Sequence, residues 1–562
     1  MGNKQRAAQG AVAFHRQTVE RLKKELEGVD RNSRGRYIRD FQRAFRSYRD
    51  LSSHDDLVLA CSKADLVLIG DYHALPASQQ FAARLLDAIA PRSGRTVLAM
   101  EMVFGRHQRV LDRWLAGDLE EGEFLTRIRY RQEWGYPWEG FREVFRVARE
   151  RGVPVVGIDC EPRDGLRFIR RRDRYAAERI ADIFARRPGT QVVVLIGESH
   201  LAPGHLPERV REALARRGLR GRAVTVLQNI EGIYWKLAEE GHERAEVVAL
   251  GEDRFCVFHS SPLAKYEAYR QTIERWKSDG ADGDQADLTP TIYRMIDTLL
   301  RFLRVDKYAT CVNHEGVCIE FLVDVYPEVY GVEDLGVFRR LLLRGGVSRP
   351  ETARIVERAR DHGSFYVPRV NAILVGEFNL VHGGEEAAHF VNAGLKGEIL
   401  DRADSRRRPR HDRFYTAVIE EALGFFGSKL FVPGRNHFFE TDIYRFYRKD
   451  PETIAKRTPY TREELDAIVH FVLLHKKFEV GYRDYDRVPP ELLAGIHSTG
   501  ARFRILTHEL GYYLGQQIYD GLERGILDQE EISRLFAEPF RETGSALRRY
   551  LDLTEKLESV RE

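Results

Sequence analysis

The sequence repeats a short motif that contains an acidic residue and a histidine. Residues 67–76 read VLIGDYHALP and residues 194–203 read VLIGESHLAP, so six of the ten positions are identical. In each copy an acid follows the glycine, and a histidine stands two positions after the acid. These residues are Asp71 and His73 in the first copy and Glu198 and His200 in the second. Imidazole and carboxylate groups can hold Zn, Mn or Fe(II), and they can also act as general acid and base.

Two further apolar runs lead into polar side chains. Glu101 directly follows TVLAM, with His107 and Gln108 shortly after it. Asp159 ends the run VPVVGID. These positions extend the set of groups that could share one site.

The elements that carry these residues have the pattern of buried strands. Short runs rich in Val, Ile and Leu, without polar alternation, occur at 66–70, 96–100, 153–159, 192–197 and 223–229. Such runs are typical of parallel strands buried on both faces. Amphipathic helical patterns lie between them, which predicts an α/β fold with a mostly parallel sheet.

This fold predicts where the histidines lie. Ligands bind outside the carboxyl ends of the strands in an open parallel sheet, and a glycine would let each chain leave its strand in a tight turn. We therefore expect His73, Glu101 and His200 at one edge of the sheet. The predicted metal-ligand set consists of His73, His200, Glu101, Asp71 and Glu198, and the same histidines and Glu101 are the candidate catalytic residues.

The chain is expected to contain four segments. We predict a helical segment over 1–50, an α/β domain over 51–277, an acidic, glycine-rich linker over 278–290 and a mainly helical domain over 291–562. Within the last domain, only CIEFLVDV and NAILVGEF have strand patterns.

Composition excludes several classes of protein. The net charge is only +3, so the overall charge of the chain would not attract nucleic acid. The five cysteines are odd in number and form no CxxC, so a disulfide framework is not expected. No apolar run approaches the roughly 20 residues of a membrane span, and the N-terminus lacks a signal-like core. These features predict a cytoplasmic location.

The second half contains histidines without a complete metal motif. Glu386 and His389 form an ExxH, but a ferritin-like di-iron site needs a second copy and two more glutamates. His508 and Glu509 begin like HExxH, but Tyr512 stands where the second histidine should be. We therefore expect structural roles for these residues.

The four segments GDYHALPASQQFAARLL, AMEMVFGRHQRVLDRWL, EWGYPWEGFREVFRVARERGVPVVGID and VVVLIGESHLAPGHLPERV resemble the ChaN-like haem-binding domain of the Tiki superfamily. The resemblance covers about residues 40–260. It implies an α/β sheet domain in which His73, Glu101 and His200 form the superfamily's shared polar site. For ChaN-type members it implies haem binding linked to iron uptake, tyrosine ligation of the iron and pairing of subunits into a homodimer.

The haem ligand is not fixed by this resemblance. Tyr72, Tyr130 and Tyr136 are candidates for ligation, and His107 is a further candidate for binding the cofactor. The chain departs from ChaN lipoproteins because it has no anchor cysteine near its start, and it carries some 270 further residues of helical sequence.

Three functions stay open at this point. The first is a ChaN-like protein that binds haem and handles iron. The second is a peptidase or esterase of the Tiki or erythromycin-esterase type, with or without a divalent metal. The third is an interaction protein that acts through its helical half.

Overall fold

The computed structural model describes residues 3–29, 36–93, 95–163, 168–242, 245–277, 288–305, 310–312, 318–320, 326–361, 363–376, 379–400, 409–435, 437, 461–481 and 490–558. The chain divides into two compact units. One comprises residues 16–286, and the other comprises residues 1–15 and 287–562. Most of the predicted linker, residues 278–287, lies outside the described residues, so the predicted segment boundaries stay predictions.

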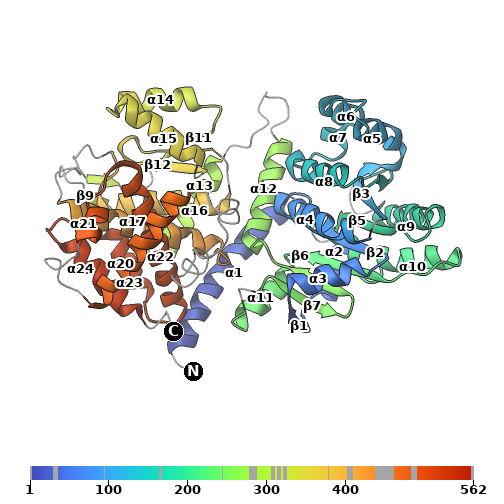
Figure 1. Cartoon of the computed structure of the whole chain (residues 1–562), viewed down its shortest axis with the longest axis horizontal. Helices are drawn as coiled ribbons and strands as arrows, with labels where there is room; N and C mark the ends of the chain where they lie inside the picture. The colour runs from blue at the N-terminus through green and yellow to red at the C-terminus, as the bar shows by residue number, and fades with distance from the viewer. Residues whose placement is uncertain are drawn as a thin grey trace. The chain divides into compact units, whose positions relative to one another are not determined.

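The first unit is built on an eight-stranded sheet with the order β1-β7-β8-β6-β2-β5-β3-β4 (Figure 1). The strands are β1 (Asp50–Ser52), β2 (Leu66–Asp71), β3 (Thr96–Phe104), β4 (Val155–Asp159), β5 (Gln191–Gly197), β6 (Ala223–Gln228), β7 (Val247–Gly251) and β8 (Arg254–Val257). The pairs from β8 through β4 are all parallel, whereas β7 pairs antiparallel with both β1 and β8. The predicted α/β class with a mostly parallel sheet is confirmed.

Helices cover both faces of this sheet. They are α2 (Arg36–Ala44), α3 (His54–Ser62), α4 (Pro76–Ser93), η2 (Gly105–His107), α5 (Gln108–Leu115), α6 (Glu121–Arg127), α7 (Tyr130–Glu133), α8 (Trp138–Glu150), α9 (Ile169–Arg186), η4 (Glu198–Leu201), α10 (Leu206–Arg216), α11 (Glu231–Glu239) and α12 (Pro262–Lys277), preceded by α1 (Asn3–Val29). Helices α3 to α8 pack on one face, and α2, α9, α10 and α11 pack on the other.

The two faces explain the unalternating strand sequences. In β2, Val67 and Ile69 enter the core beneath α4 and α8, while Leu66 and Leu68 enter the core beneath α9 and α10. Every residue of β2 is therefore buried, and polar alternation would place a polar group in one of the two cores.

The second unit is mainly helical, as predicted. Its helices are α13 (Thr289–Phe302), α14 (Leu335–Arg344), α15 (Arg349–Asp361), α16 (Leu380–Lys396), α17 (Arg410–Phe431), α20 (Arg462–Gly481), α21 (Pro490–Ile496), α22 (Gly500–Glu523), α23 (Gln529–Ala537) and α24 (Ser545–Lys556), with the short turn η5 (Pro368–Val370). Glycines allow α17 to pack closely against its neighbours, because a Cβ on Gly384 of α16 would lie 2.9 Å from the Cα of Ser428.

The sequence patterns missed several short strands of this unit. The strands are β9 (Thr310–Val312), β10 (Cys318–Glu320), β11 (Glu328–Tyr330), β12 (Ser364–Val367) and β13 (Ala372–Val375). The two predicted runs contain β10 and β13, but β9, β11 and β12 are additional. Strands of three or four residues are too short to produce a recognisable period. None of the described helices is both long enough and apolar enough to cross a membrane.

Candidate functional site

Three neighbouring parallel strands bring the predicted residues to the carboxyl edge of the sheet. Strand β5 lies between β2 and β3, and Asp71 at the end of β2 is in register with Gly197 at the end of β5. Glu101 does not follow its strand, as the sequence suggested, but lies within β3, which continues to Phe104 past an irregularity in its pairing with β4.

The carboxylate of Glu101 lies between the two histidines of the repeat. Its Oε2 is 3.6 Å from Nε2 of His73, and its Oε1 is 3.3 Å from Nε2 of His200. The backbone N–H of Gly197 donates to Oε2 at 2.6 Å, and Arg172 also donates to this carboxylate. The structure thus places His73, Glu101 and His200 in one group.

The glycine of the second copy is required for this approach, but not for the reason the sequence suggested. Gly197 has a φ of −52°, which any residue can adopt, and Gly70 is not among the glycines with positive φ. A Cβ on Gly197 would instead lie 3.0 Å from Nε2 of His73 and 3.4 Å from Oε2 of Glu101. The absence of a side chain therefore lets the histidine and the carboxylate approach the end of β5.

The two histidines have different surroundings. Nδ1 of His73 is hydrogen-bonded to Oδ2 of Asp71 at 2.8 Å, and the side chain of His73 is 19% exposed. His200 is buried, and its Nδ1 is hydrogen-bonded to Oδ1 of Asp173 at 2.5 Å. His73 is therefore the histidine of the pair that solvent or a ligand can reach.

Ionic interactions set the charge states of the buried members. Burial alone would raise the pKa of Glu101, but the charges of His200 and Arg172 hold this pKa well below its usual value. Burial would lower the pKa of His200, but Glu101 and Asp173 raise it to about 9. Around neutral pH the buried pair therefore consists of a carboxylate and an imidazolium.

Two arginines that the sequence analysis did not identify complete this network. Arg172 donates to both oxygens of Asp159 at 2.8 and 2.9 Å. Arg163 donates to Asp159 at 2.6 Å and to the backbone oxygens of Glu101 and Met102 at 2.6 and 2.9 Å. Asp159 is thus an anchor for these arginines. The run FIRRRDRY gave no sign that Arg172 and Asp173 are buried, because clustered charges usually face solvent.

Glu198, the acid of the second copy, has a separate partner. Nζ of Lys265 in α12 lies 2.7 and 2.8 Å from its two carboxylate oxygens. Burial raises the pKa of Glu198, although Lys265 opposes this shift. Lys265 is itself buried, so this is an ion pair within the fold rather than a surface contact.

The proposed metal-ligand set gains no support from this arrangement. Asp71 is hydrogen-bonded to His73 and Gln79. Glu101 accepts a hydrogen bond from Arg172, and Glu198 accepts one from Lys265. Within the described parts of the chain, no group of three or more His, Cys, Asp or Glu side chains is arranged to hold a metal ion. Because cationic or amide groups already engage these carboxylates, the residues do not fit a divalent metal site.

Aromatic rings form a series of contacts that begins at His73, in a group that we call the aromatic cluster. Its members are Tyr72, Trp134, Tyr136, Tyr269 and Trp276. Centroid distances are 4.4 Å from His73 to Trp134, 5.0 Å from His73 to Tyr136, 5.3 Å from Tyr136 to Trp276, 6.4 Å from Trp276 to Tyr269 and 6.2 Å from Tyr269 to Tyr72. Lys265 lies 4.5 Å above the ring of Tyr72. Helix α12 thus contributes two rings and a cation that the sequence analysis missed.

Two of the predicted haem-binding residues do not belong to the aromatic cluster. Tyr130 is buried, burial raises the pKa of its phenol, and its hydroxyl donates to the backbone oxygen of Tyr136 at 3.0 Å. His107 lies in η2, where Arg106 donates to its Nε2 at 3.1 Å, and burial lowers its pKa. Tyr72 and Tyr136, in contrast, are only partly buried.

Part of the first unit is similar to a known protein family. Residues 57–172 match the family model described as "Haem-binding uptake, Tiki superfamily, ChaN". The sequence resemblance to ChaN is confirmed over these residues, which carry β2, β3, β4 and the residues Tyr72, His73, Glu101 and Tyr136. The match does not extend into the second unit.

No curated protein matches the chain. Among solved structures, the chain is similar to "Cofacial heme binding to ChaN of Campylobacter jejuni", with 14% sequence identity and a TM-score of 0.25, over 32% of this chain and 86% of that chain.

Proposed function

We propose that the first unit binds haem at the carboxyl edge of its sheet, against the aromatic cluster. The observation that carries this proposal is the match of residues 57–172 to a family described as haem-binding uptake. This matched segment contains His73 and two of the partly exposed tyrosines of the cluster.

The chemistry of the cluster is suited to haem. The macrocycle is flat and largely apolar, so it gains by packing against aromatic faces and by leaving water. Trp276 is 40% exposed and Tyr72, Tyr136 and Tyr269 are partly buried, so their faces are accessible to a ligand. Tyrosine and histidine are both axial ligands of haem iron in proteins, and Tyr72, Tyr136 and His73 are the residues of this edge that could provide one.

The buried ionic network supports this role by fixing the edge. His73 is held by Asp71, and the end of β5 is held by Glu101, which Arg172 in turn engages. Residues whose rotamers are fixed by such partners lose little freedom when a ligand binds. The network therefore acts as the rigid base of the proposed haem site.

The experiment is an absorbance titration of the purified full chain with haemin. We expect a shifted Soret band that saturates at a defined ratio of haem to protein. Replacement of aromatic-cluster residues (Trp276→Ala with Tyr269→Ala) should weaken binding. Tyr48→Phe is the matched control, because Tyr48 is a partly exposed tyrosine that contacts Lys236 and Glu240 of α11 and its neighbouring turn. Absence of a saturable Soret shift would contradict the proposal.

A hydrolase is the second candidate function, and one observation favours it. Asp71 is hydrogen-bonded to Nδ1 of His73, which leaves Nε2 of His73 as the basic atom. Of the two histidines in this group, His73 is the one that is partly exposed. A carboxylate that orients a histidine in this way is the usual arrangement of a general base. A panel of ester and peptide substrates tests it, and turnover that His73→Ala abolishes while haemin binding persists would favour this reading.

A further inference from the structure

Two adjoining cavities, which the haem proposal does not use, lie at the amino ends of β3 and β4, and the second also extends along β4 to Gly105 and Gln108. Their volumes are about 680 and 600 Å³, and they share Val97, Gly152, Val153, Pro154 and Arg187. These residues come from the amino ends of β3 and β4 and from the segment after α9. Volumes of this size are typical of small-molecule sites.

Arginine dominates the charged lining of these cavities. The arginines are Arg95, Arg149, Arg151, Arg179, Arg186 and Arg187, and the acids are Asp112, Glu150 and Asp182. Two of the acids are neutralised by arginines that do not line the cavities, since Asp182 pairs with Arg217 and Glu150 with Arg146. The cavities therefore carry an excess of positive charge.

Half of these arginines are already engaged, and the other half are not. Arg151 pairs with Asp87 at 2.6 Å, Arg149 donates to the backbone of Trp114, and Arg179 donates to the backbone of Gly157. Within the described parts of the chain, the side chains of Arg95, Arg186 and Arg187 make no hydrogen bond or ion pair.

Helix ends alone do not account for these three arginines. Helices α4, α8 and α9 end at this edge, and cations near a helix C-terminus are stabilised by its partial negative charge. A side chain with that role commonly donates to the last carbonyls of the helix, but these three guanidinium groups donate to no described carbonyl. Their hydrogen-bond donors are available to a ligand.

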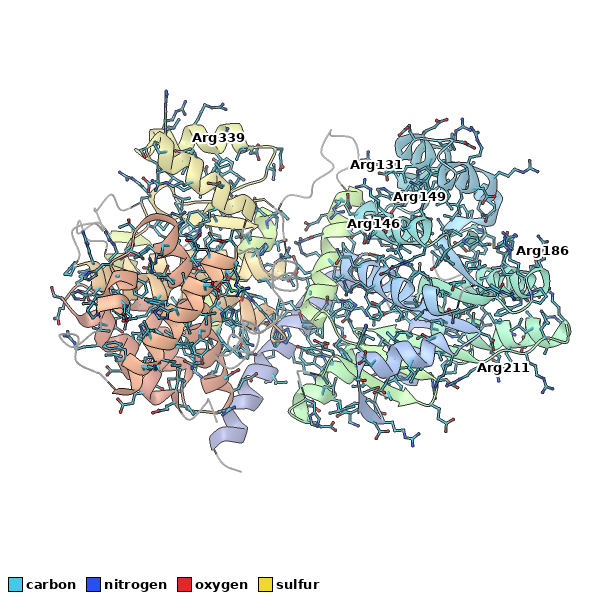
Figure 2. The ribbon with its side chains drawn as sticks, in the orientation of Figure 1. Arg131, Arg146, Arg149, Arg186, Arg211 and Arg339 are labelled. Atoms are coloured by element: carbon cyan, nitrogen blue, oxygen red, sulfur yellow. The ribbon has the colours of Figure 1, made fainter. Side chains whose placement is uncertain are left out.

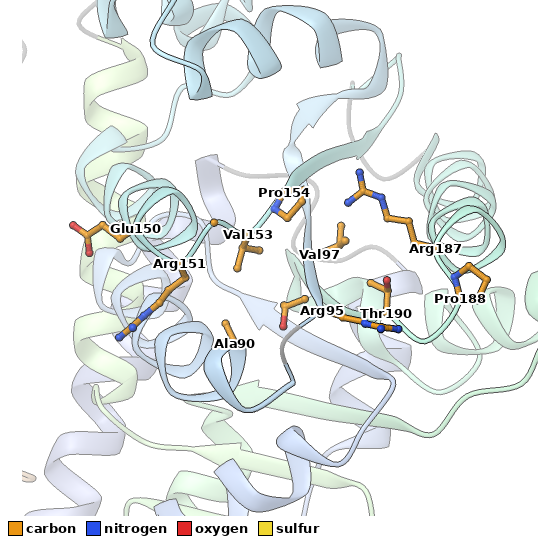
Figure 3. Close-up of a pocket in the computed structure, with 12 residues that line it drawn as sticks. Ala90, Arg95, Val97, Glu150, Arg151, Val153, Pro154, Arg187, Pro188 and Thr190 are labelled. Carbon is orange, nitrogen blue, oxygen red and sulfur yellow. The ribbon is translucent and has the colours of Figure 1, made fainter.

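The floor between the arginines is apolar. Figure 3 shows Val153, Pro154 and Val97 between Arg151 and Arg187, with Arg95 below Val97 and beside Thr190. Guanidinium groups bind phosphate through paired hydrogen bonds, and an apolar floor favours a ligand with a flat or apolar body.

We propose that this amino-edge pocket binds an organic phosphate, with its phosphate groups on Arg95 and Arg187 and its organic body over Val153 and Pro154. The class of ligand is a nucleotide-like phosphate ester. This site is independent of the haem site, because it uses the opposite ends of the same strands.

The test uses the full chain and calorimetric titration at low ionic strength, with ATP and inorganic tripolyphosphate as probes. ATP should bind saturably and more tightly than tripolyphosphate, which offers the charges without the organic body. Arg95→Ser with Arg187→Ser should raise the Kd for ATP roughly tenfold or more, because hydrogen bonds to charged groups are strong. Arg211→Ser is the matched control, an exposed arginine of α10 that lines neither cavity (Figure 2).

Folding of the variants is checked by thermal unfolding, which should be unchanged because both arginines are exposed. No saturable binding of ATP, or an equal loss of affinity in Arg211→Ser, would overturn the proposal. Binding of tripolyphosphate as tight as that of ATP would overturn the role of the apolar floor.

Discussion

Single residues at the carboxyl edge of the sheet have roles that their contacts define. Glu101 joins the two histidines of the repeat, His73 is the partly exposed member, and His200 is the buried, charged member. The repeat in the sequence predicted their proximity, because two similar strands in one parallel sheet end at similar heights. It could not predict Asp173 or Arg172, since nothing in a run of charged residues indicates which of them are buried.

Gly197→Ala tests the close approach at the end of β5. The added Cβ would lie 3.0 Å from His73 and would be confined by Glu101, so we expect a loss of about 1–3 kcal/mol in unfolding free energy. Gly204→Ala is the matched control, because its Cβ would have no atom nearer than 3.8 Å. Urea unfolding of both variants checks this, and equal stabilities would show that the space beside Gly197 is not required.

The charge of His200 predicts a pH dependence of stability. Its pKa rises from 6.5 to about 9 on folding, so its contribution is complete below pH 6.5 and is lost as the pH rises through about 9. We expect the wild type to lose roughly 2–3 kcal/mol over this window relative to His200→Gln. Urea unfolding at several pH values measures the difference, and parallel pH profiles for the two proteins would contradict the assignment.

Elements outside the matched segment complete the edge of the sheet. Helix α12 brings Lys265 to Glu198 of η4, Tyr269 to Tyr72 directly after β2, and Trp276 to Tyr136 before α8. The strands from 66 to 228 were predictable because their composition reflects burial on both faces. The antiparallel pair β7–β8 and the approach of α12 were not, since they depend on tertiary contacts rather than on a local period.

The ion pair between Lys265 of α12 and Glu198 of η4 is predicted to stabilise the contact between these two elements. Lys265→Met should cost about 3 kcal/mol of unfolding free energy, because it leaves the carboxylate of Glu198, which is only 17% exposed, without its cation. Adding Glu198→Gln should recover much of that loss. Lys236→Met is the control, since Lys236 forms a long, exposed pair with Glu240 and should change stability by less than about 0.5 kcal/mol. Strictly additive effects of Lys265→Met and Glu198→Gln in chemical denaturation would contradict this coupling.

At the scale of the whole molecule, the family match leaves the second unit unassigned. His508 and Glu386, noted there, have local partners: His508 lies 3.6 Å from Glu509, and Glu386 accepts hydrogen bonds from Ser364 and from the backbone of Tyr366. Partly buried pairs such as Arg358–Glu421 and Arg435–Glu385 belong to the same helical unit. Structural roles for these residues stay a prediction, as does the cytoplasmic location.

The central claim concerns the first unit, and the spectrum of bound ferric haem tests it most directly. The absorption spectrum of haemin-saturated full chain should be compared with those of Tyr72→Phe, Tyr136→Phe and His73→Ala. If haem iron is ligated at the carboxyl edge, one of these three variants loses the wild-type spectrum, while Tyr48→Phe retains it. If all three variants retain the wild-type spectrum and affinity, haem is not held at this edge of the sheet.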